Sequence, residues 1–519
     1  MTWDESRKLL SHNMSQFAGI RSQRGFRIIF AAVAVIFALS IFMLLPPAST
    51  TTKVLGFGQG QKPTTQSSSV EAITIDTSLI TDLSQYFADY PIQKPFKEKF
   101  GELGRRNRVL RDWLIQVETS QDSTTKSILR NAIEEVAIAQ YPFLQPPKQT
   151  QSHQSRSSRH PVQDLRASFE PDSAGIVIPT SDHTLRYAAH LIASLRSVLN
   201  STLPIQVVYA GDDDLSPTNR DHLLTLAASG PAITFLNILT VFDDTTLKLE
   251  TGGWAIKPFA ALASPFEKVI LADADAVFLQ PPEALLQHDA FVNKGALLFH
   301  DRLLWKHAFE GRHEWWRDQI RRPSKEMDAS LVWTEDYAEE ADSGLVVLDK
   351  SRPDTFMGLL HICWQNTYDV REETTYKITY GDKESWWLGL ELAGAEYEFS
   401  KHYGGVVGWE NVDDKERLGV CSFVIAHVDA KGRLLWYNGS LLKNKGQVGM
   451  EDVYEVPDKW MIDAEWVKGA RKQDHSCMVG GEVRELTRDE LDVLQRSIAA
   501  ARQVDTLAIS EFLIQRYTH

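Results

Sequence analysis

The sequence predicts an α/β protein, with a mostly parallel sheet flanked by helices. From Gly175 onward, apolar runs of strand length alternate with segments whose apolar residues recur at helical spacing. The strand-length runs contain few polar residues, which is typical of strands buried on both faces. The chain has 519 residues, 43% of them hydrophobic and 24% charged, which is enough for a large core. In such sheets, ligands bind at the carboxyl ends of the strands.

A small helical region is predicted ahead of the sheet, because residues 79–144 carry apolar side chains at helical spacing. A linker rich in Ser, Gln and basic residues follows at 148–159. A helix at 488–507, expected to pack on the main domain, is predicted near the other end. The elements predicted between them are strand 175–179, helix 185–199, strand 205–209, a helix from Pro217, strand 233–241, helix 254–262 and strand 268–271.

The first seventy residues predict a membrane anchor. Residues 28–45 are apolar except for Ser40, and as a helix they would reach about 27 Å, enough for a thin bilayer. A cleaved signal peptide is the alternative, but the run is long and lacks a clear cleavage site. Basic residues before the run predict a cytosolic tail at 1–27 and a luminal remainder. Residues 46–70, rich in Ser, Thr and Gln, predict a flexible stem.

The net charge and the cysteine content limit the classes of function that the chain could have. Lys and Arg total 55 against 69 Asp and Glu, a net charge of −14, which argues against broad electrostatic binding to nucleic acid. The 3 cysteines are too few for a disulfide framework and lack zinc-site spacing. Cys421 and Cys477 could pair in an oxidising compartment or stay free, and the sequence leaves both open. Asn200 and Asn438 begin glycosylation sequons; modification stays open for Asn200, and an unmodified side chain is favoured at Asn438.

Two carboxylates, Asp273 and Asp275, come directly after the predicted strand 268–271. Side chains at that spacing share a face of an extended chain, and like charges so close favour a compensating cation. A divalent metal that bridges them to a diphosphate explains the pair, and a turn with two solvated aspartates is the alternative. A second acidic run, 212–214, precedes Pro217, so helix capping is the favoured interpretation there.

Three further segments could take part in chemistry. His427 ends an apolar run; its imidazole suits Mn²⁺, or alternatively Mg²⁺, although a structural histidine is commoner. Residues 381–387 combine Asp382 and Glu384 with two tryptophans that could contact a sugar, and a capped amphipathic helix is an equally open interpretation. Lys257 could meet a diphosphate, although a solvated lysine is commoner.

Four stretches together resemble the fungal Golgi α-mannosyltransferases of glycosyltransferase family 71, nearest to the α-1,3-mannosyltransferase branch. They are residues 175–196, 204–215, 254–282 and 381–385. The resemblance spans roughly residues 175–440. It implies a GT-A-like fold, GDP-mannose as donor, Mn²⁺ as cofactor (Mg²⁺ as the alternative) and retention of the anomeric configuration. The expected domains are a cytosolic tail at 1–27, an anchor at 28–45, a stem at 46–70, a helical region and linker at 71–165, a catalytic domain at 170–445 and a C-terminal extension packing on it at 446–519.

The resemblance also implies a role for individual residues. Asp273, Asp275 and His427 are the expected metal ligands, with Asp273 shared between the metal and the ribose of the nucleotide. Asp382 and Glu384 are the expected catalytic residues, which would stabilise positive charge on the transferred sugar. The expected substrate-binding residues are Thr180 and Ser181 near the nucleotide, Ser343 and Gly344 under the transferred sugar, Lys257 and Asp273.

The resemblance therefore implies a metal-dependent retaining enzyme that moves mannose from GDP-mannose to a mannose-terminated glycan. The expected linkage is α-1,3, and the expected place is the Golgi membrane, within protein glycosylation and alongside other Golgi enzymes. One alternative is an α-1,2-mannosyltransferase or a UDP-sugar-dependent enzyme of the same fold. Another is a catalytically silent mannan-binding protein, which loss of the metal carboxylates would indicate. The acceptor glycan and the oligomeric state stay open.

Overall fold

The computed structural model describes residues 77–147 and 159–518, apart from gaps at 227–229, 232, 414, 446–450 and 472–473. The predicted cytosolic tail, anchor and stem, at 1–27, 28–45 and 46–70, lie outside the described residues. Within the part that is described, no helix combines the length and the apolar character needed to cross a membrane. Residues 77–519 group into one compact unit.

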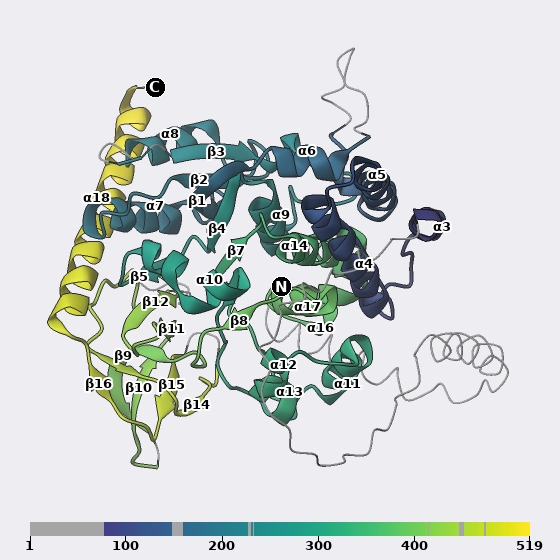
Figure 1. The fold of residues 1–519 in the computed structure, drawn as a ribbon. Coiled ribbons are helices and arrows are strands. Elements are labelled where there is room, and N and C mark those ends of the chain that lie inside the picture. Colours follow the sequence, from purple (N-terminus) through teal and green to yellow (C-terminus); the bar gives the residue numbers. More distant parts are fainter. Residues whose placement is uncertain are drawn as a thin grey trace, which may run out of the picture. The chain divides into compact units, whose positions relative to one another are not determined.

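A seven-stranded sheet forms the centre of this unit, in the order β3-β2-β1-β4-β7-β6-β8 (Figure 1). Its strands are β1 Glu170–Pro179, β2 Ile205–Tyr209, β3 Ile233–Asn237, β4 Phe266–Ala272, β6 Ala296–Leu298, β7 Leu345–Asp349 and β8 Glu398–Phe399. Strands β3, β2, β1 and β4 pair in parallel, and β7 runs antiparallel to both of its neighbours. The predicted α/β class with a mostly parallel sheet is confirmed.

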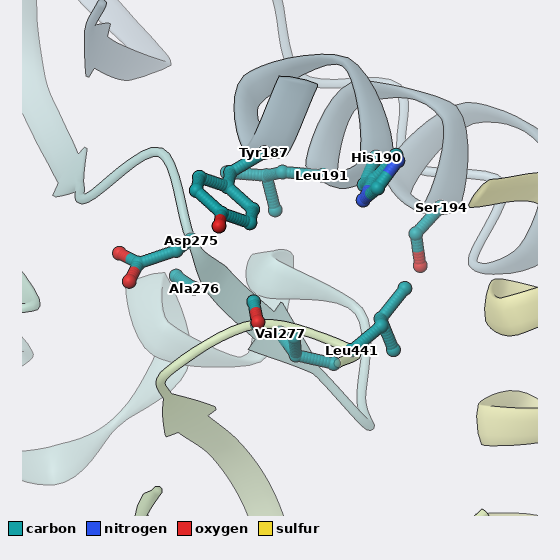
Figure 2. Close-up of a pocket in the computed structure, with 9 residues that line it drawn as sticks. Tyr187, His190, Leu191, Ser194, Asp275, Ala276, Val277 and Leu441 are labelled. Carbon is teal, nitrogen blue, oxygen red and sulfur yellow. The ribbon is translucent and has the colours of Figure 1, made fainter. Parts of the chain in front are cut away.

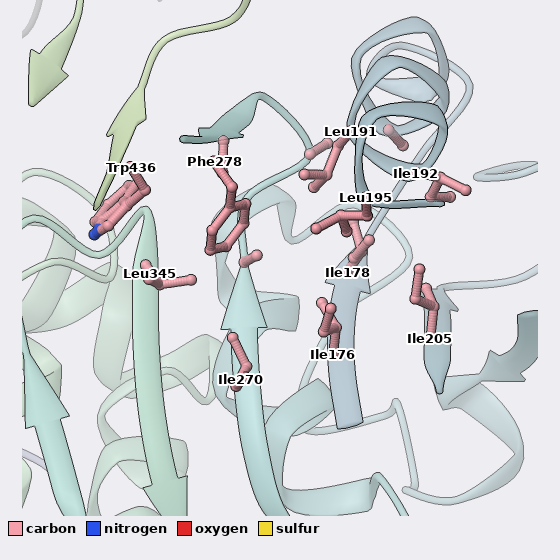
Figure 3. Packing of buried hydrophobic residues seen from close by; sticks show 14 of the residues in the cluster. Ile176, Ile178, Leu191, Ile192, Leu195, Ile205, Ile270, Phe278, Leu345 and Trp436 are labelled. Atoms are coloured by element: carbon pink, nitrogen blue, oxygen red, sulfur yellow. The ribbon is translucent and has the colours of Figure 1, made fainter. Parts of the chain in front are cut away.

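Helices cover both faces of the sheet. Helix α7 (Leu185–Ala193) points Leu191 at the same cluster that holds Ile176 and Ile270 of the strands (Figure 3). Alternate strand residues such as Val177 are buried as well, because successive side chains in a strand point to opposite faces. Helix α9 (Ile256–Ala263) contacts strands β1 and β4. Helix α14 (Pro353–Gln365) contacts strand β7. The sheet is therefore the core of the molecule, and its strand ends form the edge where the site lies.

The predicted helical region is present as α3 (Thr77–Asp89), α4 (Phe100–Thr119) and α5 (Ser123–Gln140). Helix α4 packs against α14 and against α17 (Ser385–Ala393). Arg108 of α4 donates hydrogen bonds of 2.9 Å to the backbone oxygens of Glu391 and Leu392 at the end of α17. Basic side chains stabilise the free carbonyls at a helix C-terminus, so α4 fixes the helix that follows the acidic segment 381–385.

The C-terminal part adds a six-stranded sheet, in the order β14-β15-β10-β9-β13-β16, and a three-stranded sheet, β11-β12-β5. Their strands are β5 Ala276–Phe278, β9 Val406–Val412, β10 Leu418–Ser422, β11 Ile425–Val428, β12 Leu434–Asn438, β13 Lys459–Met461, β14 Glu465–Val467, β15 Ser476–Val479 and β16 Arg484–Glu485. Cys421 and Cys477 face each other across β10 and β15 and form a disulfide, which resolves the alternative left open by the sequence. The predicted C-terminal helix is α18 (Arg488–Thr518), which packs on α7.

Candidate active site

Asp273 and Asp275 lie in a turn at the carboxyl end of β4, as predicted. The amide of Asp273 donates to the backbone oxygen of Gly344 (2.9 Å), and the amide of Ala276 donates back to the oxygen of Asp273 (3.0 Å). The backbone oxygen of Asp275 accepts from the amide of Ser440 at 2.8 Å. The turn is thus held by two other segments, while the side chains of Asp273 and Asp275 stay 27% and 20% exposed.

Lys257 joins three predicted site segments. It is buried, and its Nζ lies 2.9 Å from Oδ1 of Asp273 and 3.1 Å from Oδ2 of Asp382. The same ammonium donates to the backbone oxygen (2.7 Å) and to Oγ (3.0 Å) of Ser343. Burial alone would lower the pKa of Lys257, but the two carboxylates raise it above its ordinary value. The solvated lysine that the sequence favoured is therefore wrong, and Lys257 organises the carboxylates from within.

The site concentrates negative charge. Burial raises the pKa of Asp273, the nearby carboxylates Asp382 and Asp342 raise it further, and Lys257 opposes them. Crowded carboxylates at a partly open edge attract cations. In this structure, part of that charge is balanced by the lysines of the chain itself.

Asp275 faces helix α7 across a small pocket, lined by residues that include Tyr187, His190 and Leu441 (Figure 2). Its carboxylate forms an ion pair with Lys445, whose ammonium also lies 4.9 Å from the centre of the Tyr187 ring. Burial lowers the pKa of Lys445 to about 8, against the opposing charge of Asp273. The positive charge beside Asp275 is thus the ammonium of Lys445, which lies in the segment that follows β12.

His427 is held by Asp342. Its Nε2 lies 3.0 Å from Oδ2 of Asp342, and Oδ1 accepts from Asn438 Nδ2 (2.9 Å) and from the amide of Gly344 (3.0 Å). Burial would raise the pKa of Asp342, but the hydrogen bond and charge of His427 hold it well below its ordinary value. An ionised carboxylate only accepts hydrogen bonds, so Nε2 donates. The imidazole stacks on Trp436 at 4.4 Å, and its Nδ1 is buried without a hydrogen-bond partner.

The chemistry of these groups suits a divalent cation. A metal-binding histidine commonly donates its other ring N–H to a carboxylate, which is what His427 does, and its free Nδ1 is then a ligand. Together with the carboxylates of Asp273 and Asp275, it makes a nitrogen and oxygen donor set that suits Mn²⁺. However, no three His, Cys, Asp or Glu side chains in the described part of the chain lie close enough together to hold an ion. The three predicted ligands thus have the right chemistry for a divalent cation, but their side chains do not surround a single metal position in this structure.

The carboxylates of the acidic segment 381–385 are buried in internal contacts. Asp382 accepts from Nε1 of Trp386 (2.8 Å), and Glu384 accepts from Nε1 of Trp387 (2.6 Å) and from the amide of Glu340 (3.1 Å). Burial raises the pKa of Glu384 to about 8, opposed by the charge of Arg312. Both indoles are fully buried, so the interpretation that these tryptophans contact a sugar is wrong. Helix α17 is enclosed by α4 and α14, which leaves no exposed face for them.

Thr180 and Ser181 lie at the carboxyl end of β1, on the same sheet edge as Asp273, because β1 and β4 are parallel. The amide of Thr180 donates to the oxygen of Val208 (2.9 Å), and the amide of Ser181 donates to Oγ1 of Thr184 (2.9 Å) at the start of α7. The structure therefore brings the strand ends predicted to bind a nucleotide close to the two aspartates in the sheet.

A Cβ at Gly344 would lie 2.5 Å from Nδ2 of Asn438. A larger residue there would therefore displace the Asn438 side chain that donates to Asp342. Sequence reasoning assigned no site role to Asn438 or Lys445. Asn438 was visible only as a sequon, and nothing near Lys445 signals that it reaches Asp275. Both act through contacts between distant segments.

The acidic run 212–214 is structural, although not as a simple cap. Asp214 accepts from the amide of Ala210 (2.8 Å), and Asp212 pairs with Arg220 of α8 (Pro217–Thr225) at 2.7 Å. The amide of Ser216, at the start of α8, is instead satisfied by Asp182 (3.0 Å).

Comparison with known proteins shows a similarity to one family of enzymes. Residues 173–429 match the family model described as "Mannosyltransferase putative". Alpha-1,3-mannosyltransferase MNT3 of Saccharomyces cerevisiae is 29% identical over 48% of this chain and 44% of MNT3. Alpha-1,3-mannosyltransferase MNT2 of the same yeast is 28% identical over 53% of each chain. The chain thus spans about half the length of these curated relatives.

Among solved structures, that of the WbbM bifunctional glycosyltransferase is similar to 44% of this chain and covers 39% of its own, at 12% identity and a TM-score of 0.31. A similarity of this size carries no argument about fold or activity. The family match and the yeast relatives confirm the resemblance seen in the sequence. Residues 173–429 of this chain are thus similar to the mannosyltransferase family that the matching model describes.

Proposed function

We propose that this protein transfers mannose from GDP-mannose to a mannose-terminated glycan, with an α-1,3 linkage and retention of the anomeric configuration, on a GT-A-like fold. The observation that carries the proposal is the position of Asp273 and Asp275, at the carboxyl end of β4 in the domain that matches a mannosyltransferase family. The names of the yeast relatives MNT3 and MNT2 support the α-1,3 linkage.

The residues that would hold Mn²⁺, or alternatively Mg²⁺, are Asp273, Asp275 and Nδ1 of His427. When bound, the cation would neutralise negative charge on the departing diphosphate. The chain supplies the positioning. Lys257 keeps Asp273 and Asp382 at fixed distances, and Asp342 fixes the orientation of the His427 ring. Preorganised charge of this kind needs no rearrangement during the reaction.

The two predicted catalytic residues differ in what they can do. Asp382 shares the Lys257 ammonium with Asp273, so it is the candidate to stabilise positive charge on the transferred mannose. Glu384 holds the backbone of Glu340 and the indole of Trp387, so it acts as a positioning residue for the segment that leads to Asp342.

The proposal places the protein in the Golgi membrane as a single-pass type II protein, working alongside other glycan-processing enzymes. The apolar run at 28–45 supports the anchor. The disulfide between Cys421 and Cys477 supports a luminal domain, because disulfides persist in the oxidising secretory pathway.

The transfer reaction tests the proposal. Purified full-length protein is incubated with mannobiose, Mn²⁺ and either GDP-mannose or a panel of UDP-sugars, and the product linkage is determined by NMR. We expect an α-1,3-linked mannotriose from GDP-mannose alone. Turnover only with a UDP-sugar would refute the donor, and an α-1,2 product would refute the linkage. Binding of mannobiose without transfer from any of the donors would instead favour a catalytically silent mannan-binding protein.

A further inference from the structure

Two exposed aromatic rings stand beside the candidate site. Trp254 is 50% exposed and Tyr380 is 47% exposed, and their ring centres lie 5.2 Å apart at a tilt of 46°. Among the tryptophans in the described part of the chain, Trp254 is the one that is largely exposed. Large apolar side chains grouped on a surface commonly mark a binding site.

The aromatic pair is fixed to the site by its neighbours. Trp254 comes three residues before Lys257, Tyr380 comes two residues before Asp382, and Lys257 and Asp382 form a buried ion pair at 3.1 Å. Gly381, which follows Tyr380, has a left-handed φ of +65°, and a Cβ there would lie 2.7 Å from the Trp254 indole. Only glycine allows both the conformation and the approach, so the backbone at this point is built to bring the rings together.

We propose that Trp254 and Tyr380 form a stacking platform for a pyranose ring of the glycan acceptor, an inference that rests on the proposed mannosyl transfer. Mannose carries no charge, so a protein recognises it through hydrogen bonds and through contact between its C–H face and aromatic rings. The platform adjoins Lys257 and Asp382 in sequence, and Lys257 also pairs with Asp273. An acceptor sugar resting on it would be placed next to the reacting centre.

A nucleobase is the other flat ligand in the reaction, and the geometry points away from it. The segments expected to bind the nucleotide are the end of β1 at Thr180 and the Asp275 side of the site, where Tyr187 of α7 lies. The aromatic pair comes instead from the segments that carry Lys257 and Asp382, which are separate from the end of β1. The acceptor is therefore the occupant that the structure favours.

Steady-state kinetics of the full-length protein tests the platform. Trp254→Ala and Tyr380→Ala are each expected to raise KM for mannobiose about two- to twelvefold, equivalent to ~0.5–1.5 kcal/mol of lost ring stacking, and to leave KM for GDP-mannose unchanged. Trp254→Phe, which keeps an aromatic ring, should recover most of the loss. Tyr86→Ala is the matched control, because Tyr86 of α3 and Tyr90, which follows the helix, form another exposed pair, 53% and 63% exposed with ring centres 5.2 Å apart.

A binding measurement separates this inference from the proposed function. Saturation-transfer NMR with mannobiose, without donor, should show binding to the unmodified protein and to Tyr86→Ala, and little binding to Trp254→Ala. That result supports the platform even if no transfer occurs. Transfer with an unchanged KM for mannobiose in Trp254→Ala would overturn the platform and leave the proposed function standing. Loss of GDP binding instead of mannobiose binding in Trp254→Ala would assign the rings to the nucleotide and also overturn it.

Discussion

Lys257 shows how one buried side chain organises the site. Its ammonium contacts Asp273, Asp382 and Ser343, which come from segments far apart in the sequence. A buried charge is tolerated only when it is paired, and removing one partner leaves the other without compensation. The carboxylates of the site therefore depend on this lysine for their charge balance as well as for their position.

Lys257→Ala is expected to lower the free energy of unfolding by about 3–5 kcal/mol, because it leaves Asp382 buried without its ammonium partner. Urea denaturation followed by circular dichroism measures this. The control is Lys306→Ala, which breaks the exposed ion pair with Glu335 and a contact with the Tyr337 ring, and should shift the unfolding curve far less. Equal stability of the two variants would contradict the role given to Lys257.

Part of the site was predictable from single residues. Asp273 and Asp275 were found because an acidic pair followed an apolar run, a local pattern that needs no knowledge of the fold. The interpretation that the tryptophans of segment 381–387 contact a sugar was wrong. Trp386 and Trp387 are buried, whereas Trp254 is 50% exposed. Exposure depends on which helices enclose a segment, and α17 is enclosed by elements that lie far away in the sequence.

At the scale of elements, helix α18 is attached to α7 by a polar cluster. Asp505 of α18 accepts from Arg186 (2.6 Å) and from Tyr454 (2.6 Å), and it lies 2.7 Å from Nε2 of His190. Burial would raise the pKa of Asp505, but the hydrogen bonds from His190, Arg186 and Tyr454 hold it well below its ordinary value. The cluster borders the pocket in which Asp275 lies, since His190 lines that pocket.

Asp505→Asn should lower the free energy of unfolding by about 2 kcal/mol at pH 7, because it removes charged hydrogen bonds. The folded-state pKa lies below the unfolded value of about 3.9, so the contribution is present above that pH and is lost as the pH falls further. The difference between the variant and the unmodified protein should therefore shrink in acid. Asp492→Asn, also on α18 but exposed, is the control. A difference independent of pH would contradict this account.

The elements that the sequence predicted best are those with local signals. The alternation of strand and helix from β1 to β4 was predictable because burial on both faces produces apolar runs with few polar residues. The predicted strand at 233–241 proved too long, because β3 ends at Asn237 and a short helical turn follows. The antiparallel sheet of β9, β10, β13, β14, β15 and β16 was not predicted, since several of its strands are short and the pairs β10–β15 and β9–β13 join distant segments.

At the scale of the whole molecule, the disulfide links that sheet across 56 residues of sequence. In the chain-entropy model, closing a loop of this size stabilises the folded state by up to about 4 kcal/mol. The double variant Cys421→Ser with Cys477→Ser should therefore unfold at clearly lower urea than the unmodified protein. Adding a reductant should shift the unmodified protein to the same midpoint and leave the variant unmoved. No shift in either case would show that the bond contributes nothing in solution.

The central claim is that Asp273 and Asp275 bind a nucleotide diphosphate through a divalent cation. Isothermal titration of GDP into the full-length protein, with and without Mn²⁺, tests it most directly. We predict binding that requires Mn²⁺, an affinity at least about tenfold weaker in Asp275→Asn, equivalent to ~1.4 kcal/mol, and no change in Asp212→Asn. Equal affinity for GDP in Asp275→Asn and the unmodified protein would contradict the account, and so would GDP binding of the same affinity with and without Mn²⁺.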